Sequence, residues 1–511
     1  MERNGEPRKT LAVQASHYSA GNFLSLLAGF VTFPLLTRTL SVADYGLLSF
    51  VSLVLALLVG VGKIGLQQSI VRFFNEVRFG RRPETTESYY GTVIPSLLAA
   101  GLVFSAIWIL VAAFTPARSW SDPDVHFLLL LTTPLILVRI FESAFTNILR
   151  AQERSRDLNI YTVAKRYLSL AAILVTVLYI ARTAAGFFGA TIAAEATSLS
   201  ALAFWFLRRQ PVRIQKFSPS LFRAMLAFGL PMVVTEVSWV VFASGDRYVI
   251  QILLGSGAVG VYSAAYNICD YVQTSILAAL ISAMQPIFIR IYEESGAPLA
   301  IAFLRTFVHS YFLIAAPIVT GFSAVCEPLL TTLASDKYRA GAALVPWIIG
   351  GMVFAGVSII GGSGLYTHKR SPVTMTLILI SAVVNIALNF FLIPRYGILG
   401  SAMATLLSYM LLATMMYWAG RRYLAVPMPW LAIGRAVLLA TIMYLAIIRI
   451  SSANAIVTIG LRMVAGVLLY SALVYLFDRL AREWIRRHVR MLLQRFFASA
   501  DDRSTPGAPL P

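Results

Sequence analysis

Residues 371–419 read SPVTMTLILISAVVNIALNFFLIPRYGILGSAMATLLSYMLLATMMYWA. They contain two apolar runs of 23 residues, 371–393 and 397–419, which have no charged side chain and are separated by a Pro-Arg-Tyr turn. Each run is long enough to cross a lipid bilayer, because a hydrocarbon core about 30 Å thick takes about 20 helical residues. Lipid offers no water to open backbone groups, and the runs lack the polar alternation of a barrel strand, so we expect two membrane-spanning helices.

The same pattern fills most of the chain and predicts fourteen such helices. The predicted spans are 15–37, 45–66, 88–113, 125–149, 158–181, 184–207, 221–243, 257–284, 300–322, 340–364, 371–393, 397–419, 430–449 and 455–477. The composition agrees, because 58% of the residues are hydrophobic and 13% are charged, whereas about a quarter are charged in soluble proteins. We therefore predict an all-α polytopic membrane protein that leaves no room for a soluble catalytic domain.

Three short motifs recur at nearly one spacing. YGLLS at 45–49 returns as VGVYS at 259–263, IVRFFNE from Ile70 returns as FIRIYEE from Phe288, and GFFGATIAA from Gly186 returns as GILGSAMAT from Gly397. The offsets are 214, 218 and 211 residues, in the same order along the chain. They indicate a duplicated unit of six helices.

The repeat divides the chain into two predicted lobes, an N-lobe over 15–207 and a C-lobe over 221–419. Because six is an even number, both lobes insert in the same direction, and we expect a pseudo-two-fold axis along the membrane normal with a central cavity between the lobes. The remaining segments are predicted to be a cytoplasmic leader (1–14), an inter-lobe linker (208–220), two extra helices (430–477) and a basic amphipathic cytoplasmic tail (478–511).

Basic residues are distributed unevenly between alternate loops. One set of loops carries 16 Lys and Arg residues, and the other carries 8, among them Arg247. Because cytoplasmic loops are the more basic ones, this bias predicts that both termini are cytoplasmic. It also accounts for the net charge of +19 without a nucleic-acid partner.

Basic residues lie inside several of the predicted spans, among them Lys63, Arg139, Lys165, Arg166 and Arg305. An ionised group costs about 2.5–3.5 kcal/mol at the centre of a spanning helix, so it faces a cavity or a partner. Arg offers a bidentate fork to phosphate oxygens, and Lys offers a point charge. We therefore predict that these residues bind an anionic ligand from the cytoplasm, with a diphosphate head group as the natural candidate.

Other interpretations of these residues remain open. Lys63 and Arg305 could extend to the lipid head groups at the membrane surface. Arg139 could form a structural ion pair with Glu142, which follows three residues later on the same helical face. The two adjacent basic residues of the fifth span point to different sides of one helix, so at most one faces a shared cavity, and we favour Arg166.

Besides Glu142, the acidic residues Glu195, Glu236 and Asp270 lie inside predicted spans. A carboxyl in an apolar environment can exchange a proton near neutral pH, so we predict that these groups are sites for a coupling proton or sodium ion. The alternative is that each is a hydrogen-bonded carboxyl at a helix contact. We expect His309 to be a packed polar residue.

Several other features are expected to carry no function. Residues 60–65 spell GVGKIG, which matches GxGxxG, but the dinucleotide fingerprint needs a preceding strand and a βαβ unit. There is no GxxxxGK[ST] loop, and the two cysteines, Cys269 and Cys326, fall in apolar segments. We therefore expect packing cysteines, no cofactor, no metal and no ATP-driven transport by this chain alone.

Three stretches carry a family pattern: LLTRTLSVADYGLLSFVSLV (35–54), DRYVIQILLGSGAVGVYSAAYNI (246–268) and NIALNFFLIPRYGILGSAMATLLSY (385–409). They resemble the polysaccharide transporters, the O-antigen and teichoic acid flippases, of the multidrug/oligosaccharidyl-lipid/polysaccharide exporter superfamily. The resemblance covers at least the first twelve predicted spans.

The resemblance implies a two-lobed flippase of the bacterial cytoplasmic membrane that works by alternating access. Its substrate would be an undecaprenyl-diphosphate-linked oligosaccharide, and a proton or sodium gradient would be coupled to transport. Partners would be this lipid-linked glycan, membrane lipids and a polysaccharide assembly machinery. By the same resemblance, Arg139 and Arg166 would hold the diphosphate.

Three alternatives were weighed against this function. A multidrug antiporter of the same superfamily shares the fold, but its cavity is expected to be acidic or aromatic. A lipid II flippase is nearer in substrate, although the quoted stretches favour the polysaccharide branch. A membrane glycosyltransferase or polymerase would need a large external loop or a soluble domain, so we expect no enzyme.

Overall fold

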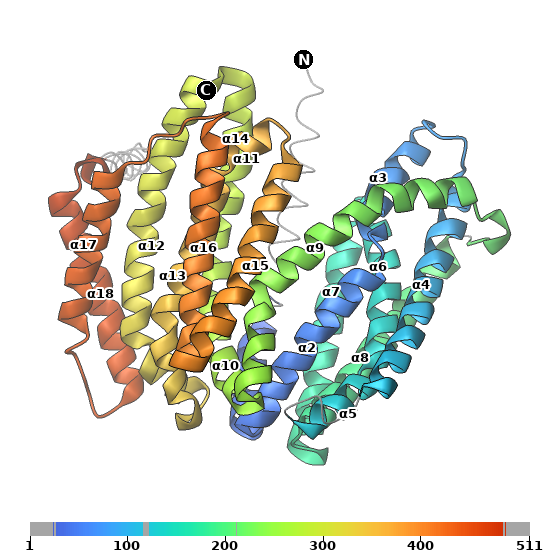
Figure 1. The fold of residues 1–511 in the computed structure, drawn as a ribbon, viewed down its shortest axis with the longest axis horizontal. Coiled ribbons are helices and arrows are strands. Elements are labelled where there is room, and N and C mark those ends of the chain that lie inside the picture. Colours follow the sequence, from blue (N-terminus) through green and yellow to red (C-terminus); the bar gives the residue numbers. More distant parts are fainter. Residues whose placement is uncertain (1–23, 25–26, 116–121, 211, 484–485, 487–511) are drawn as a thin grey trace, which may run out of the picture. The chain divides into compact units, whose positions relative to one another are not determined.

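The computed structural model describes residue 24 and residues 27–115, 122–210, 212–483 and 486. Within these ranges the chain is helical, with short turns and no strand (Figure 1). Twelve of the described helices are long and apolar enough to cross a membrane, and a bent pair of helices over 123–151 provides one more. These thirteen match the second to the fourteenth predicted spans, so the all-α polytopic fold is confirmed. The first predicted span, 15–37, lies largely outside the described residues, although residues 27–39 are helical.

The chain forms two compact units, residues 1–281 with 330–425 and residues 282–329 with 426–511. The elements that lie within the first unit are α2 (Val42–Gly62), α3 (Leu66–Arg78), α4 (Thr86–Phe114), α5 (Pro123–Leu131), α6 (Thr133–Ala151), α7 (Ser155–Val175), η2 (Thr176–Ile180), α8 (Ala184–Arg209), η3 (Ile214–Lys216), α9 (Pro219–Leu254), α10 (Ser256–Val272), η4 (Gln273–Leu277), η5 (Asp336–Leu344), α13 (Val345–Gly361), α14 (Ser363–Thr367), α15 (Ser371–Tyr396) and α16 (Ile398–Arg421).

Among the described residues, the remaining helices are α11 (Ala278–Ser295), α12 (Ala297–Leu333), α17 (Trp430–Ile447) and α18 (Ala455–Phe477). The boundaries between the units fall inside α11 and α12, while α17 and α18 belong to the second unit. The two helices predicted over 430–477 are therefore present as α17 and α18. Most of the predicted tail over 478–511 lies outside the described residues.

Two glycines let α2 and α10 touch backbone to backbone. A Cβ on Gly46 would lie 1.8 Å from the carbonyl oxygen of Ser256, and one on Gly260 would lie 2.1 Å from that of Val42. Gly46 and Gly260 are 214 positions apart, and so are Val42 and Ser256. The same contact is thus made twice with the partners exchanged, as a two-fold relation requires. The spacing is the offset of the YGLLS repeat, so the contact supports a duplicated unit.

Helix α9 is longer than the predicted span 221–243. It continues to Leu254 and ends only at Gly255, whose φ of 80° lies in the left-handed region that suits glycine. Asp246 and Arg247 are consequently helical and almost completely buried. The prediction that Arg247 belongs to an external loop is wrong, because the first residue that stops this helix comes eight positions later.

Helix α3 occupies the segment between the second and third predicted spans. Its apolar side chains, such as Ile70 and Phe73, are buried, whereas Arg72 and Arg78 point to the opposite, exposed side. The Tyr89 hydroxyl of α4 donates a hydrogen bond to the Ile70 carbonyl oxygen at 2.7 Å. This amphipathic helix forms one wall of the site described next.

Candidate functional site

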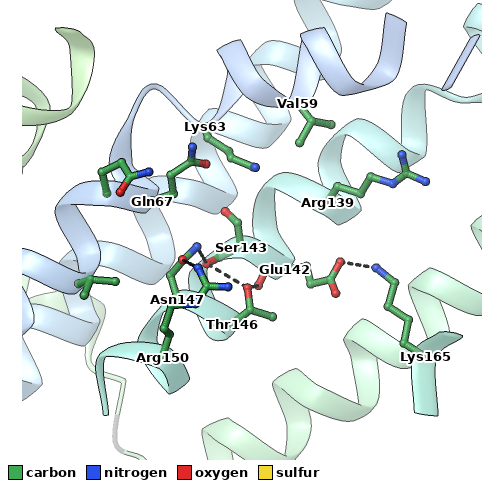
Figure 2. Close-up of a pocket in the computed structure, with 12 residues that line it drawn as sticks. Val59, Lys63, Gln67, Arg139, Glu142, Ser143, Thr146, Asn147, Arg150 and Lys165 are labelled. Carbon is green, nitrogen blue, oxygen red and sulfur yellow. Dashed lines mark hydrogen bonds and ion pairs between the residues drawn. The ribbon is translucent and has the colours of Figure 1, made fainter. Parts of the chain in front are cut away.

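A cavity of about 670 Å³ lies between the end of α2, α3, α6 and α7 (Figure 2). It is lined mainly by polar and charged side chains: Val59, Lys63, Gln67, Gln68, Val71, Arg139, Glu142, Ser143, Thr146, Asn147, Arg150 and Lys165. Figure 2 shows Lys63 and Gln67 on one wall, with Glu142 facing Lys165 on another. We call this space the charged cavity.

A tight turn between α2 and α3 places Lys63 and Gln67 at the charged cavity. Ile64 and Gly65 in this turn have φ values of 45° and 71°. A Cβ on Gly65 would lie 2.0 Å from the carbonyl oxygen of Gly229 on α9, so only glycine fits this position. The GVGKIG segment therefore has a structural role as a turn.

Arg139 on α6 forms a bidentate ion pair with Glu195 on α8. Its Nε donates to Oε2 at 2.9 Å, and its Nη2 donates to Oε1 at 3.0 Å. The suggested local pairing of Arg139 with Glu142 is wrong, because Glu142 accepts from Lys165 Nζ at 2.6 Å and from the Tyr161 hydroxyl at 2.8 Å. Lys165 Nζ also lies 3.6 Å from Glu195 Oε2. The two ion pairs thus form one network across α6, α7 and α8.

Lys63 is held on the other side of the charged cavity. Its Nζ lies 3.7 Å from Glu236 Oε1 on α9. The second carboxylate oxygen of Glu236 accepts a hydrogen bond from Gln67. Both Lys63 and Glu236 keep part of their side chains exposed, and Lys63 is the member of the pair that lines the cavity.

The lining carries an excess of positive charge even after its partners are counted. Four cations and one carboxylate line the space, which gives a formal charge of +3. Glu195 and Glu236 pair with lining cations but do not line the space themselves, and counting them reduces the formal charge to +1. An oxyanion in this space would accept hydrogen bonds from Arg and Lys side chains that are already oriented, and such charge-assisted bonds are the strong ones.

The structure brings together only some of the predicted site residues. Lys165 lines the charged cavity, and its neighbour Arg166, which the sequence analysis favoured, does not. The guanidinium of Arg166 lies beside Gly29, as does the Tyr271 hydroxyl. Asp270 on α10 and Arg305 on α12 are exposed and are not part of this lining. In the part of the chain that the structure describes, no group of three His, Cys, Asp or Glu side chains could hold a metal ion.

Sequence reasoning missed the polar stripe of α6. Ser143, Thr146, Asn147 and Arg150 all face the charged cavity together with Arg139. They recur at intervals of three or four residues, which is one face of a helix. This polar periodicity within a span was the signal that could have identified them.

Comparisons with known proteins agree on family and fold. The family model described as polysaccharide biosynthesis protein matches residues 12–292. An uncharacterized membrane protein of Methanocaldococcus jannaschii is 22% identical over 206 residues, and the match spans 40% of this chain and 40% of that relative.

Two groups of solved structures share the arrangement of helices. The lipid II flippase MurJ, in an inward closed conformation, aligns with a TM-score of 0.74 at 14% identity over 90% of this chain and 98% of its own. A multidrug resistance MATE family transporter of the MOP superfamily, in an inward-facing conformation, aligns with a TM-score of 0.63 at 16% identity over 78% of this chain and 94% of its own. These identities are low, so the likeness concerns the two-lobed helical fold.

Proposed function

Because this chain belongs to the polysaccharide biosynthesis protein family, whose model matches more than half of its length, we propose that it is a lipid-linked oligosaccharide flippase. Its substrate in this proposal is an oligosaccharide joined through a diphosphate to undecaprenol. The chain moves this amphiphile from the inner to the outer leaflet of the bacterial cytoplasmic membrane, with both of its own termini in the cytoplasm.

The observation that carries the proposal is the charged cavity. Ionised side chains are costly within spanning helices, and they mark the paths of polar substrates and ions. Here Lys63, Arg139 and Lys165 meet from three helices and keep 20–30% of their side chains exposed. A diphosphate offers several anionic oxygens, which match the bidentate fork of Arg and the point charge of Lys.

The carboxylates of the network suggest how transport is coupled to an ion gradient. Glu142 and Glu195 hold Lys165 and Arg139 in the absence of substrate. Diphosphate oxygens compete with these carboxylates for the same cations, so substrate binding releases a carboxylate that a proton or sodium ion can then occupy. Glu236 offers the same exchange at Lys63. Asp270 remains a proposed ion site outside this network.

The rest of the substrate sets the physical demands on the fold. The sugars and the diphosphate enter the cavity, while the polyprenyl chain stays in lipid between helices. Rocking of the two lobes, 15–207 and 221–419, then exposes the head group to the other side of the membrane. A polysaccharide assembly machinery would supply and consume such a substrate.

Lipid II is the second candidate substrate. The fold likeness to the lipid II flippase MurJ, with a TM-score of 0.74, favours this candidate over drug export. Both lipid-linked substrates carry a diphosphate, so the charged cavity suits either one. A multidrug antiporter for cationic compounds fits less well, because the lining is itself positively charged.

Deletion of the gene in a strain without a redundant flippase tests the proposal. We expect diphosphate-linked oligosaccharide to accumulate on the cytoplasmic leaflet, and mass spectrometry of this lipid separates polysaccharide precursors from lipid II. Wild type and Arg395→Ala, a change at an exposed arginine, should restore export, whereas Arg139→Ala should not. Normal display of the glycan after deletion would refute the flippase function.

A further inference from the structure

A second cavity lies between α2, α9 and α10. It has a volume of about 550 Å³, and its polar lining includes Ser49 and Ser52 from α2, Ser244 and Arg247 from α9, and Ser263 from α10. None of its lining residues is acidic, in contrast to the charged cavity. We call this second space the serine cavity.

Arg247 in the serine cavity is a buried cation that makes no salt bridge with a described residue. It is 9% exposed, its Nε has no hydrogen-bond partner, and it forms no ion pair with a described residue. Its guanidinium lies over the Tyr266 ring, 4.2 Å from the ring centre. Stacking on a ring does not satisfy the in-plane N–H donors of a guanidinium, and none of the described residues accepts a hydrogen bond from its Nε.

The neighbouring acid does not supply this acceptor. Asp246 accepts hydrogen bonds from the Tyr262 hydroxyl and from the backbone N–H of Arg247, the latter at 2.8 Å. Thr405 Oγ1 lies 3.5 Å from the same carboxylate. A second buried donor, the Ser263 hydroxyl, also lacks a hydrogen-bond partner, and this residue is 1% exposed.

The serine cavity and the charged cavity lie along one helix. Ser49 and Ser52 of α2 face the serine cavity, whereas Val59 and Lys63 at the end of the same helix line the charged cavity. About ten residues separate the two groups, which corresponds to roughly 15 Å of helix.

We propose that the serine cavity is a second oxyanion-binding station, in which Arg247 and the serine hydroxyls donate to phosphate oxygens. That the bound oxyanion is the diphosphate of a lipid-linked glycan rests on the proposed function, but the anion site itself does not. A head group that leaves the charged cavity meets the next set of free donors one step further along α2. The substrate therefore passes between two anion stations.

Titration calorimetry of the purified full-length chain with inorganic diphosphate, at fixed ionic strength, tests this station. Wild type should show two binding events. Arg247→Gln should weaken one event at least about tenfold and leave the other unchanged. Ser52→Leu should have the same effect, because it fills the serine cavity while keeping the charge.

The matched control is Arg395→Gln. Arg395 is exposed, and its guanidinium lies over the Phe391 ring at 4.0 Å, so this variant removes a similar stacked arginine outside the cavity. It should keep both events. If Arg247→Gln does not yield folded protein, Ser52→Leu alone decides.

Two results would overturn the proposal. The first is that wild type shows a single binding event and Arg247→Gln does not weaken it. The second is that Ser52→Leu binds diphosphate as tightly as wild type does. The titration needs no transport. If gene deletion shows no flippase function while the chain still binds diphosphate in two events, the proposed function is refuted and the second anion site is supported.

Discussion

Two ion-pair networks in this chain use the same chemistry and differ in the burial of their carboxylates and in what their cations face. In the first unit, Arg139 and Lys165 bind their acids at 2.9 and 2.6 Å and are 29% and 20% exposed. In the second unit, Asp478 accepts from Arg435 at 2.6 Å and lies 2.9 Å from His309 Nε2, and its side chain is 1% exposed. In the second network the carboxylate is sealed although Arg435 is 37% exposed, so this network holds helices together. The cations of the first network line the charged cavity and can also be offered to a ligand.

The position of Asp478 explains why its network is structural. Burial raises the pKa of Asp478, but the hydrogen bond from the Ala481 backbone N–H and the interaction with His309 outweigh burial and hold this pKa below its ordinary value. The residue follows α18 directly and ties this helix to α12 and α17. The ionised carboxylate of Asp478 therefore stabilises the packing of these three helices.

The largest expected effect is that of Asp478→Ala on stability. Removing one partner of a buried charge network costs about 3–5 kcal/mol, because here the guanidinium of Arg435 is left unpaired. The midpoint of thermal unfolding of the purified chain measures this loss. The control is Asp336→Ala, which removes an exposed acid that is 80% accessible and also pairs with an arginine. Equal shifts in the two variants would contradict the assignment of a structural role.

The next effect is the loss of transport in Lys165→Gln. We expect flipping in proteoliposomes to fall roughly tenfold to a hundredfold, as loss of one charge-assisted hydrogen bond implies. Unfolding should shift less than in Asp478→Ala, because Glu142 keeps its bond from Tyr161. Lys216→Gln, at an exposed pair with Glu87, should transport normally. If the variant is unstable yet transports at the wild-type rate per folded molecule, the role of Lys165 is only structural, like that of Asp478.

Glu142→Gln should act in the opposite direction on binding. If the carboxylate competes with substrate for Lys165, its removal should raise the affinity for inorganic diphosphate about tenfold. Glutamine keeps an acceptor for the Tyr161 hydroxyl, so the local geometry is preserved. Titration against wild type and Glu87→Gln measures the change, and weaker binding would argue against competition.

A partly exposed network on α3, outside the spanning helices, provides the smallest effect and sets the scale for the other two. Glu76 on α3 accepts hydrogen bonds from Arg82 at 2.8 Å and from Arg72 at 3.0 Å, and these bonds hold the pKa of Glu76 below its ordinary value. Its stabilisation is therefore complete above about pH 4.3 and is lost as the pH falls through the lowered pKa.

Glu76→Gln should cost about 0.2–1 kcal/mol at neutral pH, as exposed pairs do. The difference in unfolding from wild type should vanish at low pH. A difference that stays constant across the acid range would show that the pair contributes through packing and not through charge.

Most of the fold followed from the spacing of apolar residues. A run such as 371–393 is stable in lipid only as a helix, and this is why the described spans agree with the prediction. The end of α9 could not be predicted from the sequence, because two adjacent charged residues, Asp246 and Arg247, are typical of a loop. They are buried in a helix here because Tyr262 and Tyr266 of α10 contact them. Partners that lie far apart in the sequence decide whether a charge is buried.

The candidate site was predictable by residue type but not by pairing. The sequence located Arg139, Glu195 and Lys165 inside spans, and the structure joins them in one network. It did not distinguish Lys165 from Arg166, because helical rotation within a bundle depends on the neighbouring helices. Of the two, the structure places Lys165 in the lining of the charged cavity.

The double variant Arg139→Gln with Glu195→Gln tests the central claim most directly. Both charges are removed together, so no unpaired charge is left and stability should change little. If Arg139 offers its positive charge to a diphosphate, flipping in proteoliposomes should fall roughly a hundredfold while the unfolding midpoint stays close to that of wild type. Flipping at the wild-type rate would contradict the account, since it would show that the charge of Arg139 serves only to pair with Glu195.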